Sequence, residues 1–237
     1  MSMNRLFNVE TLNRLSMECH ERAKDKGFWD APHSIGHHLM LAFGELHEAI
    51  EADRLGKWAK LTLEQIEELR GLEGAAFAQA FLRMVKDSVE DEISDAVIRL
   101  LDLLGWLLKR KRTTELLTES DLNRVFAVLD TTRPDEELTH LLLRIVADTS
   151  GYWRLGLLRD KGILYAIKSL EQLSDHLGID LMTHIELKIR YNSTRPHLHG
   201  KKYQIIRLWS WGYGCVAYLP QGSEGDQVAY LLWVFLE

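Results

Sequence analysis

Two pairs of carboxylates stand three residues apart in segments of helical periodicity. Glu45 and Glu48 form the first pair, and Glu92 and Asp95 form the second. Residues three apart on a helix are neighbours on one face, so each pair offers two oxygen-bearing groups to one divalent cation. Four such acids on two facing helices could therefore hold magnesium.

The pair Glu45 and Glu48 lies on neither the main apolar stripe nor the polar side of its segment. At about 100° per residue, these two acids share a strip with Leu41 and Ala52. This indicates a helix that is covered by protein on more than one side. A carboxylate in such surroundings must be paired, protonated or bound to metal, because an isolated buried charge costs several kcal/mol. The segment favours a metal site, and a structural ion pair is the alternative.

The second pair is less informative on its own. Glu92 and Asp95 fall on one polar line with Arg99 and Asp102, opposite an apolar stripe. An ordinary solvated helix face has the same pattern, so this segment alone does not identify a metal site.

A polar and basic face occurs near the end of a later helical segment. Lys188, Asn192 and Arg195 stand at i, i+4 and i+7, with Tyr191 beside them. Lysine and arginine bind phosphate, and an asparagine amide can bind a sugar hydroxyl or a base edge. The simpler explanation is that cations near a helix C-terminus oppose the helix dipole. Both interpretations stay open.

The elements that would position these residues are mostly helices, because proline is scarce and long segments follow a 3.6-residue period. Helices are predicted over residues 8–26, 35–54, 62–70 and 75–87, the last merging into or abutting the helix that carries Glu92. Three more are predicted between 106 and 177, and Asp180 can cap the helix with the basic face. Beyond Tyr203, short aromatic and β-branched runs separated by glycine predict two or three strands. The expected fold is all-α with a short strand-like C-terminal extension.

Bulk composition excludes several classes of protein. A formal net charge of −6 offers no basic surface for duplex nucleic acid. Two cysteines, Cys19 and Cys215, are too few for a disulfide framework or a zinc ribbon, which favours a cytoplasmic setting. The N-terminus lacks an apolar signal region, and no apolar run approaches the roughly 18 residues of a membrane span. No membrane partner is expected.

Four segments that carry the aromatic, acidic and basic candidates follow one another along the chain: KGFWD, ELHEAIEADR, EDEISDAVIRLLDL and HIELKIRYNSTRPHLHGKKY. In this order they resemble the MazG-like nucleotide pyrophosphohydrolases of the all-α NTP-PPase superfamily. The resemblance covers residues 8–110 and 177–203. It implies a MazG-like helical-bundle core formed by residues 1–110 and 177–203. Residues 106–176 would be a helical insertion, and residues 204–237 a C-terminal extension with a β-hairpin.

The resemblance also implies roles for particular residues. The magnesium ligands and catalytic residues would be Glu45, Glu48, Glu92 and Asp95, with Mn²⁺ as a substitute for Mg²⁺. The substrate-binding residues would be Lys188, Tyr191, Asn192 and Arg195. Trp29 stands where relatives place an aromatic ring that stacks on the base, although a tryptophan of the core or of an interface is an equally common explanation.

The implied activity is the Mg²⁺-dependent hydrolysis of a nucleoside triphosphate to a nucleoside monophosphate and pyrophosphate, in a homodimer. The inserted helices could instead complete the bundle within one chain. The alternative function is a catalytically silent regulatory or interaction module on the same helical scaffold.

Two other metal chemistries are weaker alternatives. A di-iron or di-manganese bundle needs two Glu-x-x-His motifs on inward faces, and Glu137 with His140 supplies one. A zinc site would draw on the histidines near the first acid pair, which are His33, His37, His38 and His47. Adjacent histidines on a helix point about 100° apart, and no His-Glu-x-x-His motif is present. His33 is a candidate substrate contact.

Overall fold

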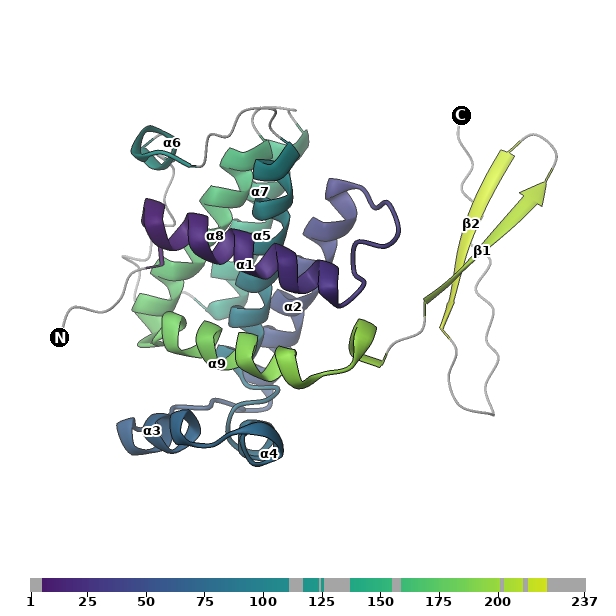
Figure 1. The fold of residues 1–237 in the computed structure, drawn as a ribbon. Coiled ribbons are helices and arrows are strands. Elements are labelled where there is room, and N and C mark those ends of the chain that lie inside the picture. Colours follow the sequence, from purple (N-terminus) through teal and green to yellow (C-terminus); the bar gives the residue numbers. More distant parts are fainter. Residues whose placement is uncertain are drawn as a thin grey trace. The chain divides into compact units, whose positions relative to one another are not determined.

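The computed structural model describes residues 6–110, 117–123, 125, 137–154, 159–200, 203–210 and 213–220. The chain divides into two units, Met1–Thr194 and Arg195–Glu237. The first unit contains α-helices throughout its described parts (Figure 1). The predicted all-α fold is thereby confirmed.

The described helices of the first unit follow one another along the chain. They are α1 (Val9–Asp25), α2 (Ile35–Arg54), α3 (Leu63–Gly71), α4 (Gly74–Met84), α5 (Val89–Arg110), α6 (Glu119–Asn123), α7 (Leu138–Arg154), α8 (Arg159–Leu177) and α9 (Leu181–Thr194). Among the described residues, none of these helices combines the length and the apolar composition that crossing a membrane requires.

Polar side chains fix where several helices begin. The Asn8 side chain accepts a hydrogen bond from the Thr11 N–H, and α1 follows directly. Thr62 forms a reciprocal capping box with Gln65 at the start of α3. The Asp180 carboxylate accepts a hydrogen bond from the Thr183 N–H in the first turn of α9. Each cap satisfies backbone donors that the first helical turn leaves free.

The helices α4 and α5 abut across a short connection and do not merge. Asp87 in this connection has a left-handed backbone conformation with φ of 62°. The Ser88 hydroxyl accepts a hydrogen bond from the Asp91 N–H, which closes the first turn of α5. The connection thus ends one helix and starts the next within a few residues.

α5 is the central helix of the first unit, and α1, α2, α8 and α9 pack against it (Figure 1). Its apolar residues Ile93, Val97 and Leu104 are fully buried, and each such side chain stabilises the fold by about 1.5–3 kcal/mol. Gly105 permits a close crossing with α1, since a Cβ there would lie 2.2 Å from the Ser16 carbonyl oxygen. The position of α5 relative to α1 therefore depends on a residue without a side chain.

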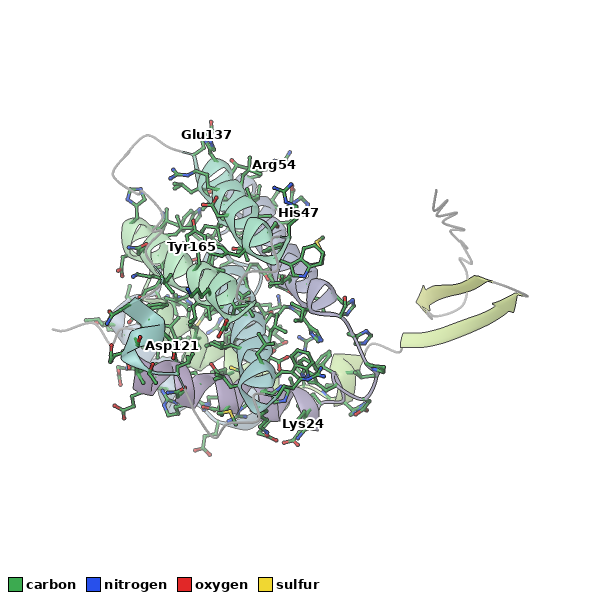
Figure 2. All side chains as sticks on the ribbon, turned by 90° about the horizontal axis from the view of Figure 1, so that it is seen from above. Lys24, His47, Arg54, Asp121, Glu137 and Tyr165 are labelled. Carbon is green, nitrogen blue, oxygen red and sulfur yellow. The ribbon has the colours of Figure 1, made fainter. Side chains whose placement is uncertain are left out.

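The segment between α5 and α9 forms further helices, as predicted. α7 packs against α8, and α8 packs against α5. The Tyr165 hydroxyl on α8 donates a 2.6 Å hydrogen bond to the Asp148 carboxylate on α7, and Tyr165 lies among the helices in Figure 2. The helices of this segment belong to the same unit as α1 to α5.

In its described residues, the second unit contains one turn of 3₁₀-helix, η1 (His197–Gly200), and two strands. β1 (Tyr203–Ser210) and β2 (Tyr213–Pro220) pair antiparallel, with Tyr203 opposite Pro220 and Ser210 opposite Tyr213. The two strands lie where strands are predicted. The last apolar run of the prediction, residues 227–236, falls outside the described residues.

Candidate metal centre

Three of the four predicted ligands come together between α2 and α5. Glu45, Glu48 and Glu92 each place one carboxylate oxygen within 4.8 Å of the others. Glu48 lies near Glu92 in the first turn of α5, while Glu45 contacts Arg99, about two turns later in that helix. The two helices are therefore antiparallel, and the acids lie on their facing sides. We refer to Glu45, Glu48 and Glu92 as the α2–α5 acid group.

The α2–α5 acid group is buried on one side and open on the other. Glu45 is 8% exposed and Glu92 is 2% exposed, whereas Glu48 is exposed to solvent. A cation could reach the group from the Glu48 side, and the buried side would strengthen its interaction with the carboxylates.

Burial leaves the charges of this group incompletely compensated. Burial, together with the neighbouring Asp91 carboxylate, raises the pKa of Glu92 to about 8. Glu92 Oε2 is buried and has no hydrogen-bond partner. Burial also raises the pKa of Glu45, although the Arg99 guanidinium opposes this effect and donates a 2.6 Å hydrogen bond to Glu45 Oε1. Arg99 and Lys86 each contact one oxygen of the group, but Glu92 Oε2 stays without a partner and is available to bind a cation.

The donor set suits a hard divalent cation. All three ligands are carboxylates, and oxygen donors favour magnesium, manganese or calcium over zinc or copper. Glu92 Oε2 would gain the partner that it lacks. These residues therefore fit Mg²⁺ or Mn²⁺.

Asp95, the fourth predicted ligand, is engaged elsewhere. Lys188 Nζ lies 2.9 Å from Asp95 Oδ2 and 2.7 Å from Asp91 Oδ1. Burial alone would raise the pKa of Asp95, but the charges of Lys188 and Arg99 outweigh it and the pKa is lowered. The structure thus brings Glu45, Glu48 and Glu92 together and pairs Asp95 with a cation from α9.

Three of the predicted substrate-binding residues, Lys188, Tyr191 and Asn192, lie on α9 and have contacts within the first unit or buried atoms. Lys188 is 0% exposed and lies between two carboxylates. Tyr191 stacks on Phe81 of α4 with ring centroids 4.5 Å apart, and Asn192 has a buried Oδ1 without a hydrogen-bond partner. Arg195 belongs to the second unit, which is described by itself.

Trp29 has the surroundings of a packed side chain. Its ring stacks on His38 at 4.2 Å and on Trp106 at 5.4 Å between centroids. Its indole N–H donates a 2.9 Å hydrogen bond to the Asp102 carboxylate, which also contacts His20 Nδ1 at 2.9 Å. The Trp29 ring and its N–H group therefore both contact other side chains of the first unit.

The weaker metal alternatives gain no support within the described part of the chain. The rings of His33 and His37 stack at 4.3 Å, but the histidines form no group with ligand atoms close enough for one ion among the residues searched. Burial, with the charges of His37 and His33, lowers the pKa of His38 to about 4. Glu137 and His140 are both exposed, and Figure 2 shows Glu137 at the periphery with its side chain pointing outward.

Sequence reasoning missed a second group of acids. Asp87, Asp91 and Glu92 also place one oxygen each within 4.8 Å of one another, and Lys86 pairs with all three. The available signal was the spacing of four between Asp87 and Asp91, followed at once by Glu92. We refer to Asp87, Asp91 and Glu92 as the Lys86 acid group.

Three successive acids in the first turn of α5 thus serve three different neighbours. Glu90 accepts hydrogen bonds from the Ala59 and Lys60 N–H groups at 2.8 and 3.0 Å. Asp91 pairs with lysines, and Glu92 joins the two acid groups. This turn ties the α2–α3 connection, α9 and the acids of α2 to one helix.

Comparisons of the chain with family models, with curated proteins and with solved structures give no match.

Proposed function

We propose that the protein is a Mg²⁺-dependent nucleoside triphosphate pyrophosphohydrolase that releases a nucleoside monophosphate and pyrophosphate. The observation that carries the proposal is the buried, partnerless Glu92 Oε2 within a group of three carboxylates. The order of the four sequence segments that resemble MazG-like enzymes supplies the reaction.

Each acid of the α2–α5 acid group has a distinct part in this proposal. Glu45, Glu48 and Glu92 would hold Mg²⁺, which neutralises the triphosphate and activates water when bound. Glu48, the exposed member, also positions the attacking water as general base. Arg99 holds Glu45 in place through its 2.6 Å hydrogen bond. Lys188 compensates the charges of Asp91 and Asp95, so that neither acid is left buried and unpaired.

Pyrophosphate release from a panel of canonical and modified nucleoside and deoxynucleoside triphosphates tests the proposal, with Mg²⁺ or Mn²⁺ present. Glu48→Gln should abolish release while the helical circular dichroism spectrum stays unchanged. Glu51→Gln is the matched control, because Glu51 lies one turn further along α2 and pairs only with Arg54 in the described contacts. Orthophosphate as the product, or unchanged turnover in Glu48→Gln, would overturn the assignment.

A second candidate is a catalytically silent helical module that binds a partner through the same scaffold. The observation in its favour is that Lys188 is fully buried between Asp91 and Asp95, so its ammonium does not face solvent. Absence of pyrophosphate release across the whole panel, in a protein that binds Mn²⁺, would favour this module.

The proposed setting and assembly follow the resemblance. We propose a cytoplasmic homodimer that binds a nucleoside triphosphate and no duplex nucleic acid, since the net charge is −6. Light scattering on the purified protein distinguishes a dimer from a monomer in which α7 and α8 complete the bundle.

A further inference from the structure

The α2–α5 acid group and the Lys86 acid group share one residue. Glu92 belongs to both, so the two groups adjoin through a single carboxylate. In two-metal sites the cations lie about 3.5–4 Å apart, a separation that the two oxygens of one carboxylate can span. The arrangement of acids therefore has the form of a site for two cations.

The second of these positions already contains a positive charge. Lys86 Nζ contacts the Asp87 carboxylate and lies 3.2 Å from Asp91 Oδ2 and 3.3 Å from Glu92 Oε1. Lys188 takes the other oxygen of Asp91 at 2.7 Å. A metal ion could enter the Lys86 acid group only if the Lys86 ammonium left it.

The two oxygens of Glu92 differ in whether a cation of the chain contacts them. Glu92 Oε1 contacts the Lys86 ammonium, whereas Glu92 Oε2 is buried without a hydrogen-bond partner. One side of this carboxylate is compensated by the chain itself, and the other side is not. Glu92 Oε2 is therefore the oxygen of this carboxylate that is left without a cation.

The backbone on both sides of Lys86 is anchored. The Lys86 N–H donates a 3.0 Å hydrogen bond to the Phe81 carbonyl, and the Asp87 N–H donates a 3.0 Å hydrogen bond to Asp91 Oδ2. The Lys86 side chain is 21% exposed. The ammonium is therefore held in the acid group by both its ion pairs and its short connection.

We propose that the Lys86 ammonium occupies the position of a second metal ion, so that the centre holds one divalent cation and not two. An ammonium supplies charge and three N–H donors, but it cannot coordinate a water and make it acidic. Lys86 is thus a positioning residue that fixes Glu92 and sets the number of metal ions. This assignment rests on the metal binding of the proposed function and not on its hydrolytic reaction.

Counting bound Mn²⁺ by electron paramagnetic resonance and by titration calorimetry tests the assignment on the full chain. The wild type should bind one Mn²⁺ per chain. Lys86→Met should bind two, with the spin-coupled spectrum of neighbouring Mn²⁺ ions. Lys57→Met is the matched control, because it removes the same charge from an exposed position near Asp87 and should still bind one ion.

Each outcome separates this assignment from the proposed function. Two ions in the wild type, or one ion in Lys86→Met, would overturn the role of Lys86 and leave a metal-dependent hydrolase intact. No ion in the wild type would overturn both. Should Lys86→Met fail to fold in metal-free buffer, Mn²⁺ should restore its helical spectrum, because the metal replaces the missing charge. Failure of Mn²⁺ to restore it would also overturn the assignment.

Discussion

Replacing Glu92 by glutamine should stabilise the metal-free protein at alkaline pH. The pKa of Glu92 is about 8, against a usual value of 4.5, because the carboxyl is buried next to Asp91. A group whose pKa is raised on folding contributes its stability in full below the unfolded value and loses it as the pH rises through the folded value. The wild type should therefore lose stability between about pH 4.5 and 8, and Glu92→Gln should lose less.

The size of this effect follows from the shift in pKa. The difference between 4.5 and about 8 corresponds to about 5 kcal/mol at pH 9 as an upper value. Water entry from the Glu48 side and relaxation of the side chains reduce it to about 2 kcal/mol. For a chain of this size, that is a rise in melting temperature of about 4–8 °C.

Thermal unfolding followed by circular dichroism at pH 6, 7.5 and 9 measures this effect, first in EDTA and then with Mn²⁺. In EDTA at pH 9, Glu92→Gln should melt above the wild type and above the control Glu51→Gln. Mn²⁺ at a hundredfold excess over Kd should increase the free energy of unfolding of the wild type by about 2.7 kcal/mol, which raises its melting temperature. The melting temperature of Glu92→Gln should not change when Mn²⁺ is added. A variant that melts below the wild type in EDTA at pH 9 would show that the Glu92 charge is already compensated without metal.

Four further predictions concern metal binding and packing. The apparent affinity for Mn²⁺ should rise by up to about tenfold per pH unit and level off above pH 8, because Glu92 must lose its proton; an affinity that is constant with pH, measured by calorimetry, would contradict this. Lys188→Met should lower the free energy of unfolding by about 3–5 kcal/mol in urea titrations, because Asp91 and Asp95 both lose this buried ammonium and, of the two, Asp91 alone keeps an ion pair with Lys86. Gly105→Ala should cost about 1–3 kcal/mol or more, since its Cβ would lie 2.2 Å from the Ser16 carbonyl oxygen. In the same titrations, Gly44→Ala should stabilise by about 0.5–1 kcal/mol, since nothing lies within 4 Å of its Cβ.

Local sequence signals predicted the helices and their starts well. Asn8 and Thr62 cap their helices as expected, because a cap depends on residues within one turn of it. The spacing of Glu45 and Glu48 likewise predicted two acids on one face of α2. The covered strip predicted that both are buried, which is confirmed for Glu45 and wrong for Glu48, which is exposed. These inferences needed only the period of the helix.

The pairing of acids with lysines could not be predicted in this way. Lys188 lies 97 residues from Asp91 in the sequence, and spacing along one helix says nothing about which partner a second helix brings. Asp95 therefore had the correct helix face for a metal ligand, but an ammonium from α9 lies against it. The stacking of Trp29 on Trp106 is also a contact between segments distant in the sequence.

The first turn of α5 has a consequence for how the chain can vary in length. Glu90, Asp91 and Glu92 each point to a different neighbour, and one residue added or removed within this turn would rotate them by about 100°. All three acids would then change neighbours at once. Their contacts with the α2–α3 connection, with Lys188 and with the acids of α2 would be lost together. Insertions and deletions that preserve the α2–α5 acid group must therefore fall in connections outside α5. A change of length there does not move one acid of this turn into the position of the next.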